Sequence, residues 1–208
     1  RGNFLDVPTD CPQRDERLGW TGDAQAFSRT AAFNMNVNSF FAKWLLDLEA
    51  DQIEGKVPFV VPNVLGTGAV NSAGWADVAT IAPWNMYLVY GDKQLLEQQY
   101  NSMKAYVESI RKIAKNDLWN SGFHFGDWLF YRPDDDNDGR AAVTDKYLIA
   151  QCFYAHSTQL LVKAAEVLDK KDDITFYTLL LQKIKDAFVK EYMTPNGRLV
   201  SGTQTAYV

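Results

Sequence analysis

The sequence predicts an all-α fold built from successive helical hairpins that form a toroid or a solenoid. Two observations predict it: apolar residues recur at helical spacing through most of the chain, and short connections alternate with long ones. The short connections are residues 91–93 and 170–173, and the long ones are 1–21, 53–74 and 117–142. This alternation places the long connections together at one end, where such an assembly collects its functional loops.

Six helical stretches are predicted along the chain. They are expected at residues 22–34, 37–52, 76–90, 93–116, 144–168 and 172–192. In the second, Phe41, Trp44 and Leu48 share one helix face, and in the fourth, Leu96 and Met103 do so. Prolines and glycines interrupt the pattern between the second and third stretches. Because no 34- or 40-residue repeat is visible, tetratricopeptide and HEAT arrays are disfavoured.

Composition excludes several classes of protein. The chain has 208 residues, 47% of them hydrophobic, which is enough for one globular unit with a sizeable core. A net charge of −5 without a dense basic run excludes a nucleic-acid partner, and no apolar stretch is long enough to span a membrane. Two cysteines imply neither a disulfide framework nor a zinc site. The aromatic residues, six Trp, ten Tyr and twelve Phe, suit a core and also the stacking of sugar rings.

The stretch DCPQRDERLGWTGDAQ, residues 10–25, concentrates charges around one tryptophan. Pro12 within it and Pro8 just before it keep it out of a regular helix. If it is extended, Arg14 and Glu16 lie on the same side. Thr21 is the expected N-cap of the next helix, and Asp23 lies in its first turn, where the helix dipole favours an ionised carboxylate.

Glu16 has the surroundings of a general acid in this stretch. It lies near Asp10 and Asp23 and near the indole of Trp20 in sequence. Like charges and apolar cover both raise a carboxyl pKa, which a general acid near neutral pH requires. The alternative is a structural loop in which the neighbouring arginines neutralise the acids, and spacing alone favours neither.

Two further loops repeat the same combination of Gly, Asp and Trp. Trp75 and Asp77 stand where a loop enters a helix, and Asp127 and Trp128 follow Gly126. An indole beside a carboxylate suits a hydroxylated ligand, although composition alone slightly favours Trp75 as a core residue. Three such loops at one end of a helical assembly predict a carbohydrate site.

An acidic run in the last of these loops resembles the start of a calcium-binding loop. Asp134, Asp136 and Asp138 alternate before Gly139, and Asp145 falls at the twelfth position. The motif expects Glu at that position and a helix in front, whereas Pro133 precedes this run. Calcium binding and a solvated acidic turn therefore both stay open, and no cofactor is required.

Several blocks of the sequence together resemble one family. They are DVPTDCPQRDERLGWTGDAQ, VPFVVPNV, GWADVATIAPW, GDW and SGTQTAYV. Their order and spacing resemble the catalytic domain of bacterial α-L-rhamnosidases, glycoside hydrolase family 78, almost from end to end. The resemblance implies an (α/α)6 barrel with its site at one rim, of which residues 1–208 are a partial domain holding about half of the helices.

The resemblance also assigns roles to residues. It implies that Glu16 is the general acid, that Asp10, Arg14 and Asp23 hold rhamnose hydroxyls, and that Trp20, Trp75 and Trp128 line the sugar pocket. The two further loops add Asp77 and Asp127 to this set. The expected substrate-binding residues are therefore Asp10, Arg14, Trp20, Asp23, Trp75, Asp77, Asp127 and Trp128.

The resemblance implies inverting hydrolysis of terminal α-L-rhamnosides by a longer parent enzyme. The family's general base is a Glu downstream of the TQTAYV block, so the isolated chain is expected to be inactive and to work with the remaining domains of its parent. Two alternatives remain: another inverting (α/α)6 glycosidase, or a non-catalytic helical module that binds carbohydrate. The sequence does not decide the compartment, although a periplasmic or extracellular one is slightly favoured.

Overall fold

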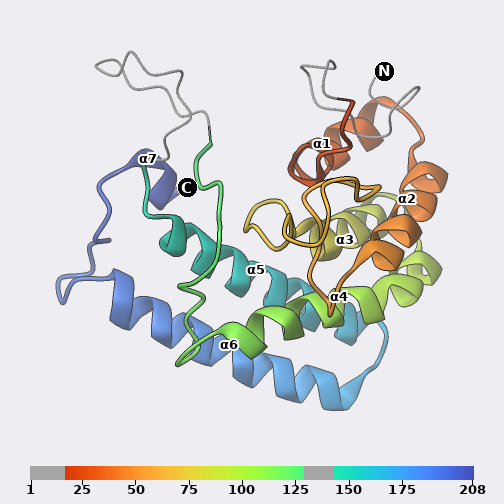
Figure 1. The fold of residues 1–208 in the computed structure, drawn as a ribbon. Helices are drawn as coiled ribbons and strands as arrows, with labels where there is room; N and C mark the ends of the chain where they lie inside the picture. The colour runs from red at the N-terminus through yellow and green to blue at the C-terminus, as the bar shows by residue number, and fades with distance from the viewer. Residues whose placement is uncertain (1–16, 129–142) are drawn as a thin grey trace.

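The computed structural model describes residues 17–128 and 143–208, shown in colour in Figure 1. The helices are α1 (Thr21–Asn34), α2 (Asn38–Asp51), α3 (Val78–Tyr90), α4 (Lys93–Ile113), α5 (Lys146–Val167), α6 (Lys171–Tyr192) and the short α7 (Gln204–Tyr207). In these ranges the other backbone pairing consists of isolated bridges, with no strand. The predicted all-α fold is confirmed, and each of the six predicted helices is present.

The six long helices pack in two rows. The helix α3 contacts α1 and α5 within one row, and it contacts its chain neighbours α2 and α4 in the other. The helix α2 also contacts α4, while α5 and α6 run side by side along much of their lengths (Figure 1). Each helix from α2 to α5 therefore packs against its successor. A second set of contacts joins helices that are two apart in the chain: α1 with α3, α2 with α4, and α3 with α5.

The connections differ in length on the two sides of the helices. Residues 35–37, 91–92 and 168–170 are short links, whereas residues 52–77 join α2 to α3 by a long path. Figure 1 shows the α5–α6 link at the right edge and the segment that follows α4 on the opposite side. The long connections therefore share one side of the molecule, and this side holds the candidate site.

Side chains and glycine set most helix ends. Asp92 caps α4 by accepting from the N–H of Leu95 at 2.9 Å, and Asp145 caps α5 by accepting from the N–H of Tyr147 at 2.7 Å. Gly91 ends α3 with φ 66°, a left-handed conformation that costs glycine little. Polar residues at these positions therefore fix where α4 and α5 begin.

The expected N-cap of α1 was wrong. Trp20 occupies the N-cap position, and Thr21 is the first residue of the helix. The hydroxyl of Thr21 is buried and donates to the carbonyl of Phe59 at 3.0 Å, so it joins α1 to the 52–77 connection instead of capping the helix. Asp23 does lie in the first turn, as predicted.

Two other predicted boundaries also shift. The helix α4 ends at Ile113 because Ala114 is already extended, with a ψ of 134°, and Asn116 and Asp117 then adopt left-handed φ angles of 53° and 61°. The helix α3 begins at Val78, two residues later than expected, because residues 72–77 form a separate turn. That turn carries Trp75.

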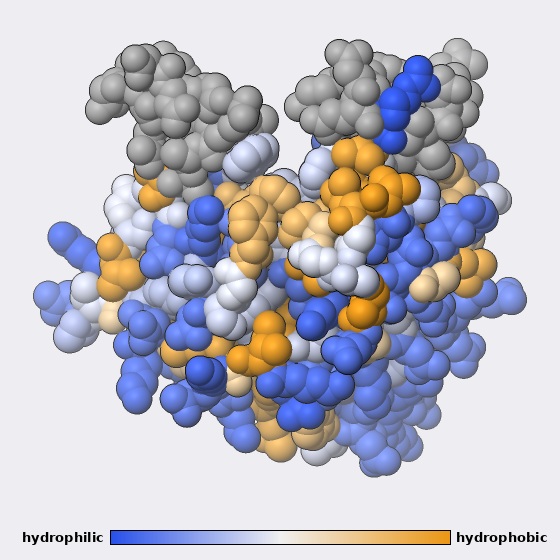
Figure 2. Space-filling view, viewed as in Figure 1, coloured by the Kyte–Doolittle hydropathy of each residue, from blue (hydrophilic) through white to orange (hydrophobic). Residues whose placement is uncertain are grey.

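The core lies between the two rows of helices. The helix α2 contributes Phe41, Trp44 and Leu48, at the positions that the helical spacing predicted. The largest fully buried side chains are Trp44, Trp119, Tyr106, Tyr154, Tyr177, Phe41, Leu45, Leu48, Met86, Leu96, Met103 and Ile110. Hydrophilic residues dominate the outer side of α4 and α6, in the lower part of Figure 2. Across the described ranges, no helix is long and apolar enough to span a membrane.

Candidate active site

The long connections meet in an aromatic cluster centred on Phe125, which sequence reasoning missed. The ring centroid of Phe125 lies 4.4 Å from Trp75, 5.5 Å from Trp128 and 6.1 Å from Trp20. Phe59 lies 5.1 Å from the same ring. The three tryptophans that the sequence predicted for the sugar pocket are thus brought together by one phenylalanine. With Phe123 these residues are called the aromatic cluster below.

The aromatic cluster is partly open to solvent. Phe59 is only 8% exposed and forms its base, whereas Trp128 is 42% exposed and Phe123 is 57% exposed. Orange and pale side chains gather across the upper middle of the face in Figure 2, in contrast to the blue lower part. A flat apolar surface with an open side suits the C–H face of a sugar ring. The alternation in FHF, residues 123–125, was the available signal, since it places both phenylalanines on the side opposite His124.

Trp20 is held by a short stretch of paired backbone before α1. The N–H of Val61 donates to the carbonyl of Gly19 at 2.9 Å, and the N–H of Thr21 donates to the carbonyl of Phe59 at 2.9 Å. Trp20 and Val60 therefore form an isolated antiparallel bridge. This pairing docks the end of the charged stretch on the 52–77 connection and turns Trp20 toward Phe125.

Trp75 sits between α1 and Phe125 on a tight turn. Gly74 has a φ of 79°, which favours glycine, and its carbonyl accepts from Nε2 of Gln25 on α1 at 3.0 Å. A Cβ atom at Gly22 would lie 2.8 Å from the Trp75 ring, so the indole rests directly on the backbone of α1. The ring therefore has α1 on one side and Phe125 on the other.

The contact between Gly22 and Trp75 leads to a first prediction. Gly22→Ala is expected to displace the Trp75 indole, because a new methyl group cannot fit 2.8 Å from ring atoms. We expect a loss of about 1–3 kcal/mol in the free energy of unfolding, the usual cost of overpacking. Urea denaturation of the complete protein, followed by tryptophan fluorescence, measures it. Gly68→Ala is the control, since a Cβ there meets no atom within 4 Å; an equal loss in both variants contradicts the prediction.

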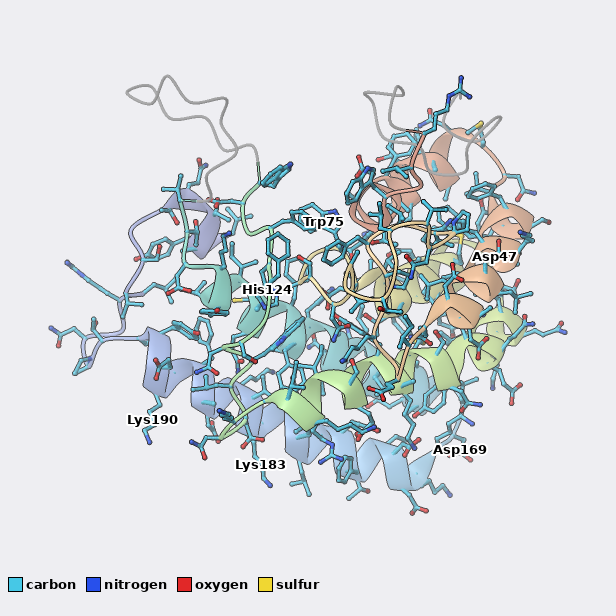
Figure 3. All side chains as sticks on the ribbon, viewed as in Figure 1. Asp47, Trp75, His124, Asp169, Lys183 and Lys190 are labelled. Atoms are coloured by element: carbon cyan, nitrogen blue, oxygen red, sulfur yellow. The ribbon has the colours of Figure 1, made fainter. Side chains whose placement is uncertain are left out.

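His124 joins the second and third loops from beneath the aromatic cluster. Its Nδ1 accepts from the N–H of Ala73 at 3.0 Å, so the neutral ring carries its proton on Nε2, 3.2 Å from the carbonyl of Ser121. Next to it, the N–H of Phe125 donates to Oγ of Ser72 at 3.1 Å. Figure 3 shows Trp75 and His124 close together in the middle of the molecule, far from the labelled surface residues Lys183 and Lys190. These two hydrogen bonds fix Phe125 relative to the turn that carries Trp75.

The buried histidine predicts that acid weakens the loops of the site. Burial, together with the nearby Lys146, lowers the pKa of His124 below its usual 6.5. When these loops open, His124 regains its usual pKa and binds a proton at a higher pH than it does in the folded state. The free energy that keeps the loops closed is therefore fully present above about pH 6.5, and it is lost as the pH falls from there toward the lowered folded-state pKa. We expect peptides covering residues 71–76 and 121–126 to open more readily at pH 5.5 than at pH 7.5.

Hydrogen exchange of the complete protein, corrected for the intrinsic pH dependence, measures this opening. His124→Gln is expected to remove most of the difference between the two pH values for these peptides. His156→Gln is the matched control, because His156 lies on α5 outside both peptides. A pH difference that survives in His124→Gln contradicts the assignment to His124.

Asp77 is fully buried at the N-cap position of α3. Its Oδ2 accepts from the N–H of Gly74 at 2.8 Å, and its Oδ1 accepts from the Ser157 hydroxyl of α5 at 2.5 Å. Burial raises the pKa of this carboxyl, while the two hydrogen bonds act in the opposite direction. Both oxygens have protein partners and neither faces solvent, so the structure does not support the expected direct contact between Asp77 and a sugar.

Asp127 also directs its carboxylate at the protein. Oδ1 accepts from the N–H of Val143 at 2.8 Å, and Oδ2 accepts from the Thr144 hydroxyl at 2.9 Å. The Thr205 hydroxyl donates to Oδ2 at 3.4 Å. Asp127 therefore connects the segment that carries Trp128 to the residues before α5 and to α7, and its sugar contact stays a prediction.

The remaining predicted site residues fall in two groups. Asp23 is half-buried in the first turn of α1, one residue after the glycine beneath Trp75, and its sugar contact stays a prediction. The others lie outside the described residues: Asp10, Arg14, Glu16, Asp134, Asp136 and Asp138.

Of the predicted calcium ligands, Asp145 is the one that lies within the described residues. Asp145 uses Oδ1 to accept from the N–H groups of Tyr147 and Leu148, as the cap of α5. Within residues 17–128 and 143–208, no group of three or more His, Cys, Asp or Glu side chains is placed to hold a metal ion. Calcium binding by the acidic run stays a prediction.

Known proteins resemble this chain in sequence and in fold. The family model described as the bacterial α-L-rhamnosidase six-hairpin glycosidase domain matches residues 1–208. An α-L-rhamnosidase of Formosa agariphila is 44% identical over the whole chain, and one of Alteromonas is 40% identical. The chain spans only 22% and 23% of these two proteins.

Solved structures give the same result. The native α-L-rhamnosidase of Aspergillus terreus matches 99% of the chain with a TM-score of 0.90 and 40% identity, over 24% of its own length. The Streptomyces avermitilis α-L-rhamnosidase complexed with L-rhamnose matches the whole chain with a TM-score of 0.86 and 39% identity, over 19% of its length. The two rows of helices are therefore about half of an (α/α)6 barrel of the six-hairpin glycosidase class. The chain belongs to the bacterial α-L-rhamnosidase family.

Proposed function

We propose that the complete protein carrying this chain hydrolyses terminal α-L-rhamnosides with inversion of configuration. The observation that supports it most directly is the convergence of Trp20, Trp75 and Trp128 on Phe125, immediately after the charged stretch. A relative with 39% identity and the same fold is described in complex with L-rhamnose. The aglycone is left open in this proposal.

The described residues have two tasks in the proposed reaction. The aromatic cluster packs against the C–H face of the rhamnosyl ring and excludes water from that side, which strengthens the hydrogen bonds made to its hydroxyls. Asp23, in the first turn of α1 where the helix dipole favours a carboxylate, accepts from sugar hydroxyls. Both tasks orient the glycosidic bond for protonation.

The proton comes from Glu16 in this proposal. In an inverting glycosidase, one carboxylic acid protonates the leaving oxygen while a second carboxylate activates water on the opposite face of the sugar. The two carboxyl groups lie about 6.5–9.5 Å apart. We assign the first role to Glu16 and expect the second carboxylate from a part of the complete protein outside this chain. Asp10 and Arg14 are proposed to hold sugar hydroxyls beside it.

Product analysis tests the proposal on the complete protein. With an aryl α-L-rhamnoside, the first-formed sugar is expected to be β-L-rhamnose, seen by proton NMR before mutarotation. Release of the α-anomer first contradicts inversion, and hydrolysis of an α-L-fucoside without hydrolysis of the rhamnoside contradicts the substrate. The isolated chain of 208 residues is expected to be inactive in the same assay. Sugar binding by a complete protein that hydrolyses no glycoside favours the non-catalytic alternative.

A further inference from the structure

The buried Asp77 carboxyl connects the 72–77 turn to the helical core. Ser157, which donates to Oδ1 at 2.5 Å, lies on α5, and its Oγ is also 2.8 Å from Oγ1 of Thr80 on α3. Oδ2 reaches back to the N–H of Gly74 at 2.8 Å. The buried side chain of Asp77, at the start of α3, thus links α5 to Gly74, the residue that precedes Trp75.

The N–H and the carbonyl of Gly74 are each held by a side chain, one from the same turn and one from α1. Asp77 holds the N–H on one side, and Gln25 of α1 holds the carbonyl on the other at 3.0 Å. Gly74 has a φ of 79°, so the turn depends on a backbone conformation that other residues rarely adopt. The direction in which the chain enters Trp75 is therefore set by Asp77 and Gln25.

The Trp75 ring has little room to follow a shift of that turn. It rests on the backbone of Gly22, where a Cβ would be 2.8 Å away, and its centroid lies 4.4 Å from that of Phe125. A displacement of about 1 Å in the turn would break one contact or compress the other, because close-packed interiors leave few voids.

We propose that Asp77 is a positioning residue, which does not touch the sugar but fixes Trp75 in the aromatic cluster through Gly74. The proposal rests on the proposed function of this site for the part that concerns substrate. Its structural part, that the position of Trp75 depends on Asp77, holds independently of any reaction.

Fluorine NMR of the complete protein labelled with 5-fluorotryptophan tests the structural part. The Trp75 resonance is assigned by its loss in Trp75→Phe. Asp77→Leu keeps a similar side-chain shape but removes both acceptors, so the N–H of Gly74 loses its partner, while Ser157 can still donate to Thr80. We expect the Trp75 resonance to shift or broaden in Asp77→Leu, while the resonances of Trp44 and Trp119 in the core stay unchanged.

Two variants serve as comparisons. Asp169→Asn, at the exposed site labelled in Figure 3, is expected to leave the Trp75 resonance and the kinetics unchanged. Gln25→Met removes the other support of Gly74 and is expected to shift the same resonance. If Asp77→Leu does not fold, Gln25→Met still tests whether the supports of this turn position Trp75.

Kinetics show whether the position of Trp75 matters for substrate binding. With the rhamnoside substrate, Asp77→Leu is expected to raise KM about tenfold and to change kcat by less than about threefold, as for lost binding that is equal in ground and transition states. An unchanged Trp75 resonance overturns the proposal, whether or not KM rises. Absence of rhamnoside hydrolysis by the unmodified protein contradicts the proposed function but leaves the fluorine experiment valid.

Discussion

Glu16→Gln in the complete protein is expected to lower kcat on rhamnosides with alkoxide leaving groups by about 10²- to 10⁴-fold, the usual contribution of general acid catalysis. Glutamine has the shape of glutamate but has no proton to give to the glycosidic oxygen. An aryl rhamnoside with an acidic phenol as leaving group needs little protonation, so its kcat should fall much less. Steady-state kinetics with the two substrates measure the difference.

Binding and a matched control complete this prediction. Rhamnose affinity, measured by calorimetry, is expected to stay within about tenfold of the unmodified protein, because the aromatic cluster is untouched. Glu97→Gln is the control, since Glu97 is exposed on α4. Equal kcat values for the Glu16→Gln and unmodified proteins on the alkoxide substrate remove Glu16 from the acid role.

Gln151→Met is expected to cause the largest loss of stability. Gln151 is fully buried on α5, where its Oε1 accepts from the N–H of Trp119 at 2.8 Å. Its Nε2 donates to the carbonyls of Asp117 and Ile184 at 2.9 Å and 3.1 Å. Methionine fills similar space but removes the partner of the Trp119 N–H and of the Asp117 carbonyl, while the Ile184 carbonyl keeps its hydrogen bond within α6. Each buried unsatisfied group costs about 1–3 kcal/mol. We expect a loss of about 3 kcal/mol or more.

Urea denaturation of the complete protein measures this loss. Gln94→Met is the matched control, because Gln94 is exposed at the start of α4. A Gln151→Met protein as stable as this control contradicts the prediction. The same variant is also expected to loosen the segment around Trp119, which leads from α4 to His124 and Phe125.

Helical spacing and capping residues predicted the helices well because both act within a few residues. The buried faces of α2 and α4 follow directly from the i, i+3, i+4 pattern. Thr21 shows where such local reasoning fails: its hydroxyl serves a carbonyl at Phe59, far along the chain, instead of the end of its own helix. The end of α4 was also missed, because the chain leaves the helix at Ala114, and alanine is the best helix former.

The candidate site was predicted in its residue types but not in its arrangement. Trp20, Trp75 and Trp128 were recognised on separate loops. Phe125, which contacts all three, was overlooked because a phenylalanine in a sequence resembles any core residue. Asp77 was expected to face a sugar. Its burial depends on Ser157, 80 residues away, and no local pattern carries that information.

The packing of each helix from α2 to α5 against its successor has a consequence for the order of folding. Contacts between neighbouring hairpins are local, so they form quickly, whereas loop closure over long stretches is slower. The links within the site are the distant ones: Gln25 to Gly74 spans 49 residues, and Ala73 to His124 spans 51. We therefore expect the aromatic cluster to assemble after the helices. A chain that has just acquired its full helical content would still lack a sugar-binding surface.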